Sequence, residues 1–228
     1  VFGGEGHKLV GDLLGHFPCK LLIATSNWLK MNHSATANEI IEVTQEELSR
    51  ASLQKTPQEV LAVFVQPSYD LNPEVIKSSL CLALDDVQDP GNLGTIIRLA
   101  DWFGIEHIFC STGTADVYNP KTVQATMGAL ARVKVHYCSL PQLIESLTDI
   151  PVYGTFLNGN IIYTESLSAH GLIVMGNEGK GVSLEVEKLI NNKLYIPNYP
   201  QERETSESLN VAIATAVVCS EFRRRLLP

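Results

Sequence analysis

A strand–turn–helix pattern between residues 79 and 104 constrains the fold of this chain more than any other feature. Residues 79–84 are apolar and lack helical spacing, which is typical of a buried strand in an α/β sheet. Turn residues at 89–92 break the strand, and apolar side chains then recur every three or four positions over 93–103. We therefore expect a helix with one buried face, which ends at Gly104.

The same alternation continues through the rest of the chain. We expect strands at 106–110, 133–137, 152–157, 171–175 and 194–196, and helices at 121–130, 141–147, 184–190 and from 208 or nearby. This order predicts a parallel sheet covered by helices, in which ligands bind at the C-terminal ends of the strands. The loops that follow strands are therefore the candidate sites.

The first third of the chain predicts a smaller α/β domain. We expect a helix at 7–14, strands at 20–24, 39–43 and 60–65, and a capped helix start at Thr44. Two prolines, Pro67 and Pro73, lie in a polar segment that reads as a linker. We place the domains at 1–66 and 79–228, with the linker at 67–78. Residues 1–4 show no clear pattern, as if an upstream element were missing.

Composition narrows the class of protein. The chain has 228 residues, of which 45% are hydrophobic, and no segment has the apolar length of a membrane span or the pattern of a signal peptide. The five cysteines have no CxxC spacing and the six histidines no HExxH pairing, which predicts reduced thiols and no metal. We expect a soluble, cytoplasmic protein without a membrane partner.

A net charge of −8 argues against binding to DNA or RNA mainly by counterion release, although it leaves room for local contacts. We expect no DNA partner. The run of arginines at 223–225 is open to two interpretations, a solvated helix end that complements the helix dipole or a contact with RNA.

The polar side chains at the starts of two expected helices, near Asn92 and near Ser208, can each be interpreted in two ways. Helical side chains lean toward the N-terminus, so Arg98 is expected to reach back toward Asn92 and the free N–H groups of the first turn. Alternatively, Asn92 is an N-cap and Arg98 pairs with Asp101 at the surface. Ser208 is likewise open to interpretation as an N-cap or a site residue.

A glycine-rich loop at 176–181 follows the expected strand at 171–175. Its spacing matches neither GxxxxGK[ST] nor GxGxxG, so the usual phosphate and dinucleotide fingerprints are absent. Glycines let a ligand approach the backbone closely. A turn at Gly181 followed by Ser183 as an N-cap explains the end of this loop but leaves Asn177, Glu178 and Gly179 without a role.

Three segments together, 85–98, 176–181 and 196–211, resemble in order and spacing the three motifs of the SpoU (TrmH-like) RNA 2′-O-ribose methyltransferases of the SPOUT superfamily. The resemblance covers 80–225. Residues 5–65 are similar to the L30e-like substrate-binding domain that often precedes it. The resemblance implies an α/β fold with a parallel sheet and a C-terminal trefoil knot, preceded by a small L30e-like domain.

The resemblance also implies an activity. It implies an enzyme that transfers methyl from S-adenosylmethionine to a ribose 2′-hydroxyl of structured RNA, with ribosomal RNA favoured over tRNA, and a homodimer that pairs through the knotted domain. The alternatives are a tRNA 2′-O-methyltransferase and a non-catalytic RNA-binding relative. A nicotinamide-dependent reductase would share the sheet, but the chain lacks its fingerprint.

By the same resemblance, one set of residues is catalytic and another contacts the cofactor. The catalytic positions are Arg98, Asn92, Glu178, Ser208 and Asn210, and the cofactor positions are Leu157, Gly176, Ile196 and Leu209. A guanidinium loses its proton only with great difficulty, so we interpret Arg98 as a grip on a substrate phosphate that also organises the exit of the proton. A sulfonium cofactor without phosphate suits glycine-rich and apolar loops.

Overall fold

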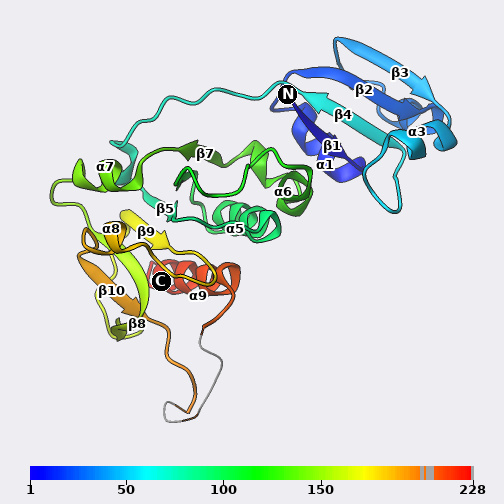
Figure 1. The fold of residues 1–228 in the computed structure, drawn as a ribbon. Helices are drawn as coiled ribbons and strands as arrows, with labels where there is room; N and C mark the ends of the chain where they lie inside the picture. Colours follow the sequence, from blue (N-terminus) through cyan, green and yellow to red (C-terminus); the bar gives the residue numbers. More distant parts are fainter. Residues whose placement is uncertain (201–202, 204–207, 227–228) are drawn as a thin grey trace.

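The computed structural model describes residues 1–200, 203 and 208–226. The molecule is elongated and consists of two β-sheets, each with its own helices, which an extended segment joins (Figure 1). Within the described residues, no helix is long and apolar enough to cross a membrane.

The N-terminal sheet has four strands in the order β1-β4-β2-β3. Strands β2 and β3 are parallel, while β4 runs antiparallel to both β1 and β2. The elements are β1 (Phe2–Glu5), α1 (His7–Leu14), β2 (Cys19–Thr25), α2 (Ser26–Met31), β3 (Glu39–Val43), α3 (Gln45–Ala51) and β4 (Val60–Phe64). The capped helix start expected at Thr44 is confirmed, because Thr44 and Glu47 form a complete capping box.

Strand β1 occupies the first residues, which showed no clear pattern in the sequence. Its residues pair with β4 from Phe2↔Phe64 to Glu5↔Leu61. Phe2 is buried, with its ring 5.3 Å from Phe17 and 5.5 Å from Phe64. The sequence does not show the alternation of a strand here, because residues 3 and 4 are both glycine. Phe2 is the only long apolar side chain in β1 that marks its buried face.

The second sheet has six parallel strands in the order β10-β8-β9-β5-β6-β7. Its strands are β5 (Leu80–Leu84), β6 (His107–Cys110), β7 (Lys134–Tyr137), β8 (Val152–Ile161), β9 (Gly171–Met175) and β10 (Asn192–Tyr195). Its helices are α4 (Val75–Ser78), α5 (Pro90–Trp102), α6 (Pro120–Thr126), α7 (Leu140–Glu145), α8 (Leu184–Glu187) and α9 (Val211–Arg224), with a 3₁₀ turn η1 (Ala129–Ala131). The expected parallel α/β fold is confirmed.

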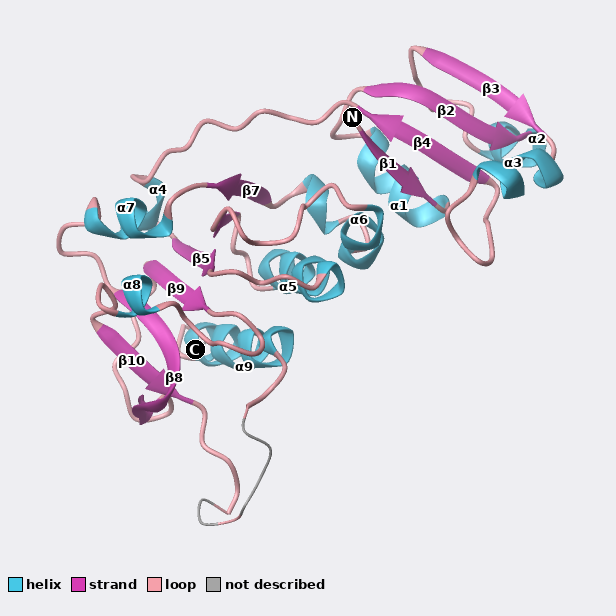
Figure 2. Cartoon of the chain, viewed as in Figure 1, coloured by secondary structure: helices cyan, strands magenta, loops and turns pink. Residues whose placement is uncertain are grey.

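Helices cover both faces of this sheet (Figure 2). Alternate residues of β5 divide between two cores: Leu80, Leu82 and Leu84 pack in the cluster that includes α5 and α9, whereas Cys81 and Ala83 pack in the cluster that includes α7 and α8. A strand covered on both faces has no polar side, and this is why β5 reads as an unbroken apolar run.

The strand order reverses between β5 and β9. From β5 the chain proceeds outward to β6 and β7, then crosses to β8 and returns to β9 beside β5. Ligands of open α/β sheets bind outside the carboxyl ends of the strands at such a switch point. The segments that follow β5 and β9 therefore lie where a ligand is expected. The trefoil knot stays a prediction, because its threading depends on a segment in which residues 201, 202 and 204–207 lie outside the described residues.

The expected helix at 121–130 ends early. Helix α6 stops at Thr126, because Met127 and Gly128 adopt left-handed backbone conformations with φ of 51° and 91°. A Cβ at Gly128 would lie 2.3 Å from the Asp12 carboxylate on α1, so only glycine permits this approach of the two sheet units. Nearby, the rings of Phe2 and Tyr118 lie 5.0 Å apart.

The arginines at the end of α9 contact the rest of the chain, so the interpretation as a merely solvated helix end is wrong, while a contact with RNA stays a prediction. Arg223 donates to the carbonyls of Phe103 and Gly104 at the end of α5. Arg225 donates to main-chain carbonyls in the 162–165 segment. Arg224 and Arg225 both donate to the buried carboxylate of Glu221. The run therefore ties α9 to its neighbours.

We predict that Glu221→Gln lowers the free energy of unfolding at pH 7 by roughly 1.5 to 3 kcal/mol, the range for hydrogen bonds to charged groups. Hydrogen bonds from Arg224 and then Arg225 hold the pKa of Glu221 at about 2. A depressed pKa gives stability that is complete above the unfolded pKa and disappears as pH falls toward 2. Urea titrations of both proteins at several pH values test this.

The matched control is Glu74→Gln, whose ion pair with Lys77 is largely exposed and should contribute less than about 1 kcal/mol. A constant gap between wild type and Glu221→Gln from pH 5 to pH 2 would contradict the prediction.

Candidate active site

The site is built at the carboxyl ends of β5 and β9. Asp85 directly follows β5 and is buried. Its N–H donates to the Met175 carbonyl at 2.9 Å, and its carboxylate accepts the N–H of Ser183 at 2.7 Å. One residue therefore ties the end of β5 to both ends of the glycine-rich loop.

Asn177 organises the glycine-rich loop from within. Its main-chain N–H and carbonyl both pair with Gly181 at 2.9 Å. Its side chain donates to the Asp86 carbonyl at 2.7 Å and accepts the N–H groups of Gly179 and Lys180. The loop is therefore a closed turn that presents Glu178. Ser183 occupies the N-cap position of α8, but its side chain forms no capping hydrogen bond.

Gly176 is required by the close approach of the loop to itself. A Cβ at this position would lie 2.3 Å from main-chain atoms of Gly181 and Val182. Any side chain would force the loop open. Glycine is therefore needed at position 176 for packing as well as for access of a ligand to the backbone.

The N-cap of α5 is Asp89, not Asn92. The Asp89 carboxylate accepts the N–H of Asn92 at 2.8 Å, and Pro90 occupies the first turn. The alternative that made Asn92 the cap is therefore wrong. The side chain of Asn92 remains available for other contacts.

The Asn92 amide joins all three motifs. Its Nδ2 donates to Glu178 Oε1 at 2.9 Å, and its Oδ1 accepts from Asn210 Nδ2 at 3.0 Å. Glu178 and Asn210 are 86 and 118 residues away in sequence. The structure thus brings together three of the five expected catalytic residues.

Asn210 is itself the N-cap of α9. Its Oδ1 accepts the N–H groups of Ala212 at 2.9 Å and Ile213 at 3.3 Å, which directs its Nδ2 to Asn92. The expectation that Ser208 caps this helix is wrong, since the helix begins at Val211. Ser208 is exposed and precedes the cap by two residues.

Arg98 lies apart from this cluster. It is exposed, and among the described residues no hydrogen bond or ion pair engages its guanidinium. Six residues turn a helix by about 600°, so Arg98 points roughly a third of a turn away from Asn92. The alternative surface pair with Asp101 is also wrong, because Arg132 binds both Asp101 oxygens at 2.8 Å.

Lys121 is a site neighbour that sequence reasoning missed. From α6 its Nζ donates to Asp89 Oδ2 at 2.8 Å, and this bond is the main reason that the pKa of Asp89 is below its usual range. The pair links residues 32 positions apart, and no local pattern marks it. A cation therefore stands beside the first turn of α5.

Of the expected cofactor positions, Gly176 and Ile196 directly follow β9 and β10, whereas Leu157 lies within β8 and Leu209 precedes α9. Leu157 extends beyond the last β8–β9 pair, Gly154↔Val174, and is 74% exposed. Leu209 is 49% exposed and Ile196 is half-buried. Apolar side chains and loop backbone without a phosphate cradle suit a sulfonium cofactor. The described residues hold no group of three His, Cys, Asp or Glu that could bind a metal.

Two family models match this chain. The SpoU rRNA methylase family matches residues 79–220, and the MRM3-like substrate binding domain matches residues 1–62. The 23S rRNA (guanosine(2553)-2′-O)-methyltransferase RlmP of Bacillus subtilis is 34% identical over 184 residues, which cover 79% of this chain and 71% of the relative. The mitochondrial rRNA methyltransferase 3A of Danio rerio is 25% identical, with 98% of this chain and 63% of the relative covered.

Solved structures match over nearly the whole chain. A TrmH-family protein from Porphyromonas gingivalis has a TM-score of 0.86 at 43% identity, covering 98% of this chain and 90% of its own. The SpoU methyltransferase AviRb from Streptomyces viridochromogenes, solved in complex with AdoMet, has a TM-score of 0.85 at 26% identity, covering 99% and 90%.

We predict that Asn210→Ala lowers the free energy of unfolding by about 1 kcal/mol through loss of the cap, with a further loss from the unpaired Asn92. Ser208→Ala is the matched control and should cost less, because Ser208 does not cap α9. Urea denaturation followed by circular dichroism measures both. A larger loss in Ser208→Ala would reverse our assignment of the cap.

Proposed function

This chain belongs to the SpoU rRNA methylase family, and from that premise we propose that it transfers the methyl group of S-adenosylmethionine to a ribose 2′-hydroxyl of ribosomal RNA. The observation that carries the proposal is the Asn92 bridge, because it assembles Glu178 and Asn210 at the switch point of the sheet. Relatives that are named for 23S rRNA methylation support ribosomal RNA over tRNA.

The bridge gives the catalytic residues distinct tasks. A ribose hydroxyl is a weak nucleophile at neutral pH, so the enzyme must align it and provide for its proton. Asn92 occupies Glu178 Oε1. The second carboxylate oxygen has no donor among the described residues and is available to a substrate hydroxyl. Asn210 holds the Asn92 amide in the orientation that this requires.

The cofactor and the phosphate are held by other groups. When bound, S-adenosylmethionine supplies an electrophilic methyl group on a positively charged sulfur. Leu157, Gly176, Ile196 and Leu209 provide its apolar and backbone surface. Arg98 has no partner among the described residues, so its planar guanidinium is free to bind an RNA phosphate at two points.

We predict that Arg98→Ala leaves the affinity for S-adenosylmethionine nearly unchanged and lowers the methylation rate by about 100-fold or more. Arg98→Lys should recover little of the methylation rate, because lysine keeps the positive charge but lacks the planar guanidinium with its two parallel donors. The measurements are calorimetry with the cofactor and single-turnover methylation of ribosomal RNA. Lys188→Ala, at an exposed lysine that follows α8, is the control. Near-normal turnover by Arg98→Ala would remove this residue from the mechanism.

We further propose a homodimer that pairs through α5 and α9. These helices pack against each other, and each exposes a large apolar side chain: Trp102 on α5 is 83% exposed and Ile213 on α9 is 55% exposed. Large apolar side chains that are exposed on two packed helices mark a candidate protein interface. The small residues between 212 and 216 allow close approach of a second helix.

We predict that Ile213→Glu shifts the dimer to monomer, since pairing would bury an unpaired charge. Sedimentation velocity at micromolar concentration measures the change. Ile40→Glu is the matched control, because Ile40 is 46% exposed on β3 and outside this face. A wild-type protein that sediments as a monomer would contradict the proposal.

The roles of the two domains are also proposals. The N-terminal domain, at 1–66, selects the RNA, and residues 79–228 bind the cofactor and carry out the transfer. The match of the MRM3-like substrate binding domain to residues 1–62 supports this division. Contacts of Phe2 with Tyr118 and of Asp12 with Gly128 hold the two parts against each other.

A further inference from the structure

Asp86, the second residue after β5, has a left-handed backbone conformation, with φ of 60°. This conformation is uncommon for a residue other than glycine and is sterically costly. Such strain persists only where neighbouring groups hold it in place, and it is concentrated at functional sites. Asp86 lies at the switch point of the six-stranded sheet, so the groups that hold it indicate what the strain is for.

Groups that follow two neighbouring strands hold this backbone. The Asp86 N–H donates to the Oγ of Ser111, which directly follows β6, at 2.8 Å. The Asp86 carbonyl accepts from the Nδ2 of Asn177, shortly after β9, at 2.7 Å. Because Asp86 itself follows β5, one left-handed residue connects the carboxyl ends of three adjacent strands.

The side chain of Asp86 takes no part in this connection. Its Oδ1 accepts from Gln88 Nε2 at 3.1 Å. The group that Asn177 contacts is the main-chain carbonyl, and the left-handed conformation sets the direction of this carbonyl. A change of backbone conformation at residue 86 would therefore direct the carbonyl away from the glycine-rich loop.

Asn177 passes this position on to the glycine-rich loop. While its Nδ2 donates to Asp86, its Oδ1 accepts the N–H groups of Gly179 at 2.9 Å and Lys180 at 3.0 Å. Glu178 lies between Asn177 and these two N–H groups in the chain. One amide therefore fixes the backbone on both sides of Glu178 and anchors it to the end of β5.

The position of Glu178 depends on this anchor. Its Oε1 accepts from Asn92 Nδ2 on α5 at 2.9 Å. The main-chain pair between Asn177 and Gly181 closes the loop, but it does not fix the loop relative to α5. The contact with Asp86 does, because Asp86 precedes α5 on the same continuous segment of chain.

We propose that Asn177 is a positioning residue for methyl transfer, which holds Glu178 against Asn92 by anchoring the glycine-rich loop to the left-handed carbonyl of Asp86. The inference rests on the proposed function, because it takes Glu178 as a catalytic residue. An amide suits this role, since it donates to the strand end and accepts from the loop at once, whereas a carboxylate only accepts.

The first test removes the anchor and keeps the turn. Asn177→Asp retains an oxygen that accepts the N–H groups of residues 179 and 180, but it cannot donate to Asp86. We expect the kcat of ribosomal RNA methylation to fall about 10- to 100-fold, since a misplacement of about 1 Å can cost about 100-fold. The affinity for S-adenosylmethionine, measured by calorimetry, should change little because the turn stays closed.

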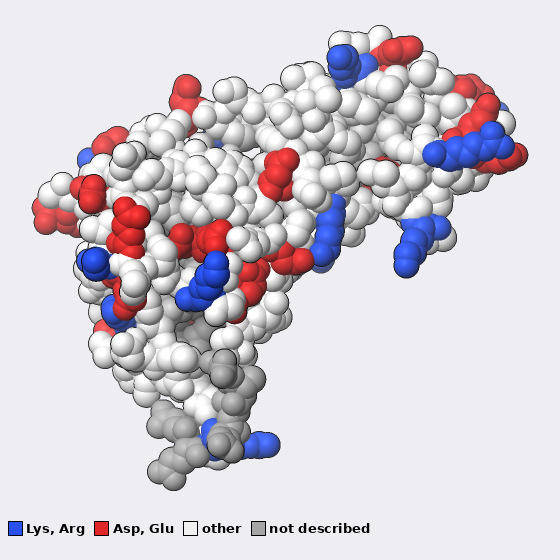
Figure 3. All heavy atoms as spheres, viewed as in Figure 1, with Lys and Arg blue, Asp and Glu red and all other residues white. Residues whose placement is uncertain are grey.

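Asn177→Asp also adds a negative charge. Basic side chains on the face of the molecule in Figure 3 are scattered among acidic ones rather than gathered in a patch, so one more charge should change the KM for RNA only modestly. The neutral variant Asn177→Ala loses the donor and the acceptor together and should lower kcat at least as far. A raised KM with an unchanged kcat in both variants would overturn the proposal.

The second test changes the backbone at residue 86. Asp86→Val introduces a β-branched residue that strongly disfavours the left-handed conformation, so kcat should fall. Asp149→Val is the matched control, because Asp149 has φ of 59° but precedes β8, at the opposite edge of the sheet. Both variants should lower the midpoint of thermal unfolding, and only Asp86→Val should lower kcat.

Glycine adopts the left-handed conformation without strain, so Asp86→Gly should recover most of the rate that Asp86→Val loses. Equal losses of kcat in the two valine variants would assign the effect to general destabilisation and overturn the proposal.

A double-mutant cycle tests whether Asn177 acts through Glu178. In a Glu178→Ala background, Asn177→Asp should cause little further loss of kcat, because the effects of residues that act as a unit do not add. Additive losses would make the contribution of Asn177 independent of Glu178 and overturn the proposal.

The wild type separates this proposal from the proposed function. If the wild type methylates ribosomal RNA and the Asn177 variants have a normal kcat, only the positioning role is overturned. If the wild type transfers no methyl group to ribosomal RNA, the proposed function is overturned and the positioning role with it.

Discussion

The side-chain amide of Asn92 is the interaction on which the candidate site depends. Its two ends contact Glu178 and Asn210, which belong to segments that follow β9 and precede α9. An amide suits this position because it donates and accepts at once, whereas a carboxylate would repel Glu178. The bridge persists because Asp89 caps the helix and leaves the Asn92 side chain uncommitted.

The sheet supplies the frame that makes this bridge possible. Asp85 joins the end of β5 to the loop after β9, and Asn177 closes that loop on itself. At the far end of α9, Arg223 and Arg225 tie the helix to its neighbours through main-chain carbonyls. Each end of α9 is therefore fixed by side chains that a solvated helix would leave free.

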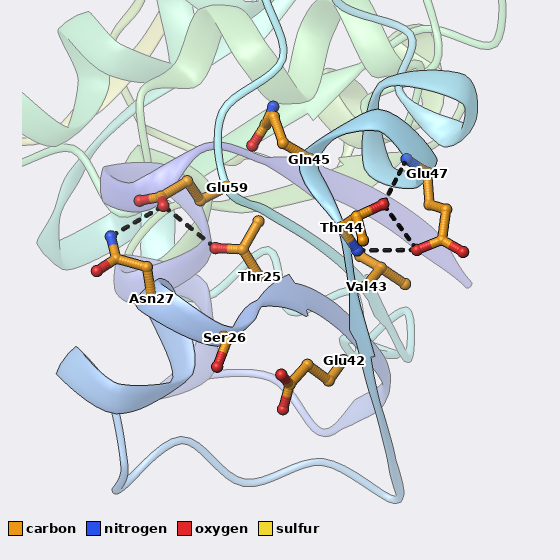
Figure 4. Close-up of a pocket in the computed structure, with 9 residues that line it drawn as sticks. All are labelled: Thr25, Ser26, Asn27, Glu42, Val43, Thr44, Gln45, Glu47 and Glu59. Atoms are coloured by element: carbon orange, nitrogen blue, oxygen red, sulfur yellow. Dashed lines mark hydrogen bonds between the residues drawn. The ribbon is translucent and has the colours of Figure 1, made fainter.

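The two sheet units present different functional groups. The six-stranded sheet carries the amide bridge, apolar loop positions and an arginine without a partner among the described residues. The four-stranded sheet carries an open depression lined by hydroxyls, amides and carboxylates (Figure 4). Contacts at Phe2 and Gly128 join the two units.

The sequence by itself determined the class of fold and the strand–helix order, because apolar periodicity and turn residues are local signals. It also placed β3 and α1 at their observed bounds. It missed β1, whose glycines weaken the pattern, and it extended α6 past the left-handed backbone at Met127.

The roles of single polar residues were decided only by the tertiary structure. Local spacing could not choose between Asp89 and Asn92 as a cap, nor show that Arg132 takes Asp101 from Arg98. It could not reveal Lys121 beside Asp89. The physical reason is the same in each case: a side chain's partner is set by which segments the folded sheet brings together, and the Asn92–Asn210 pair, for example, joins residues 118 positions apart.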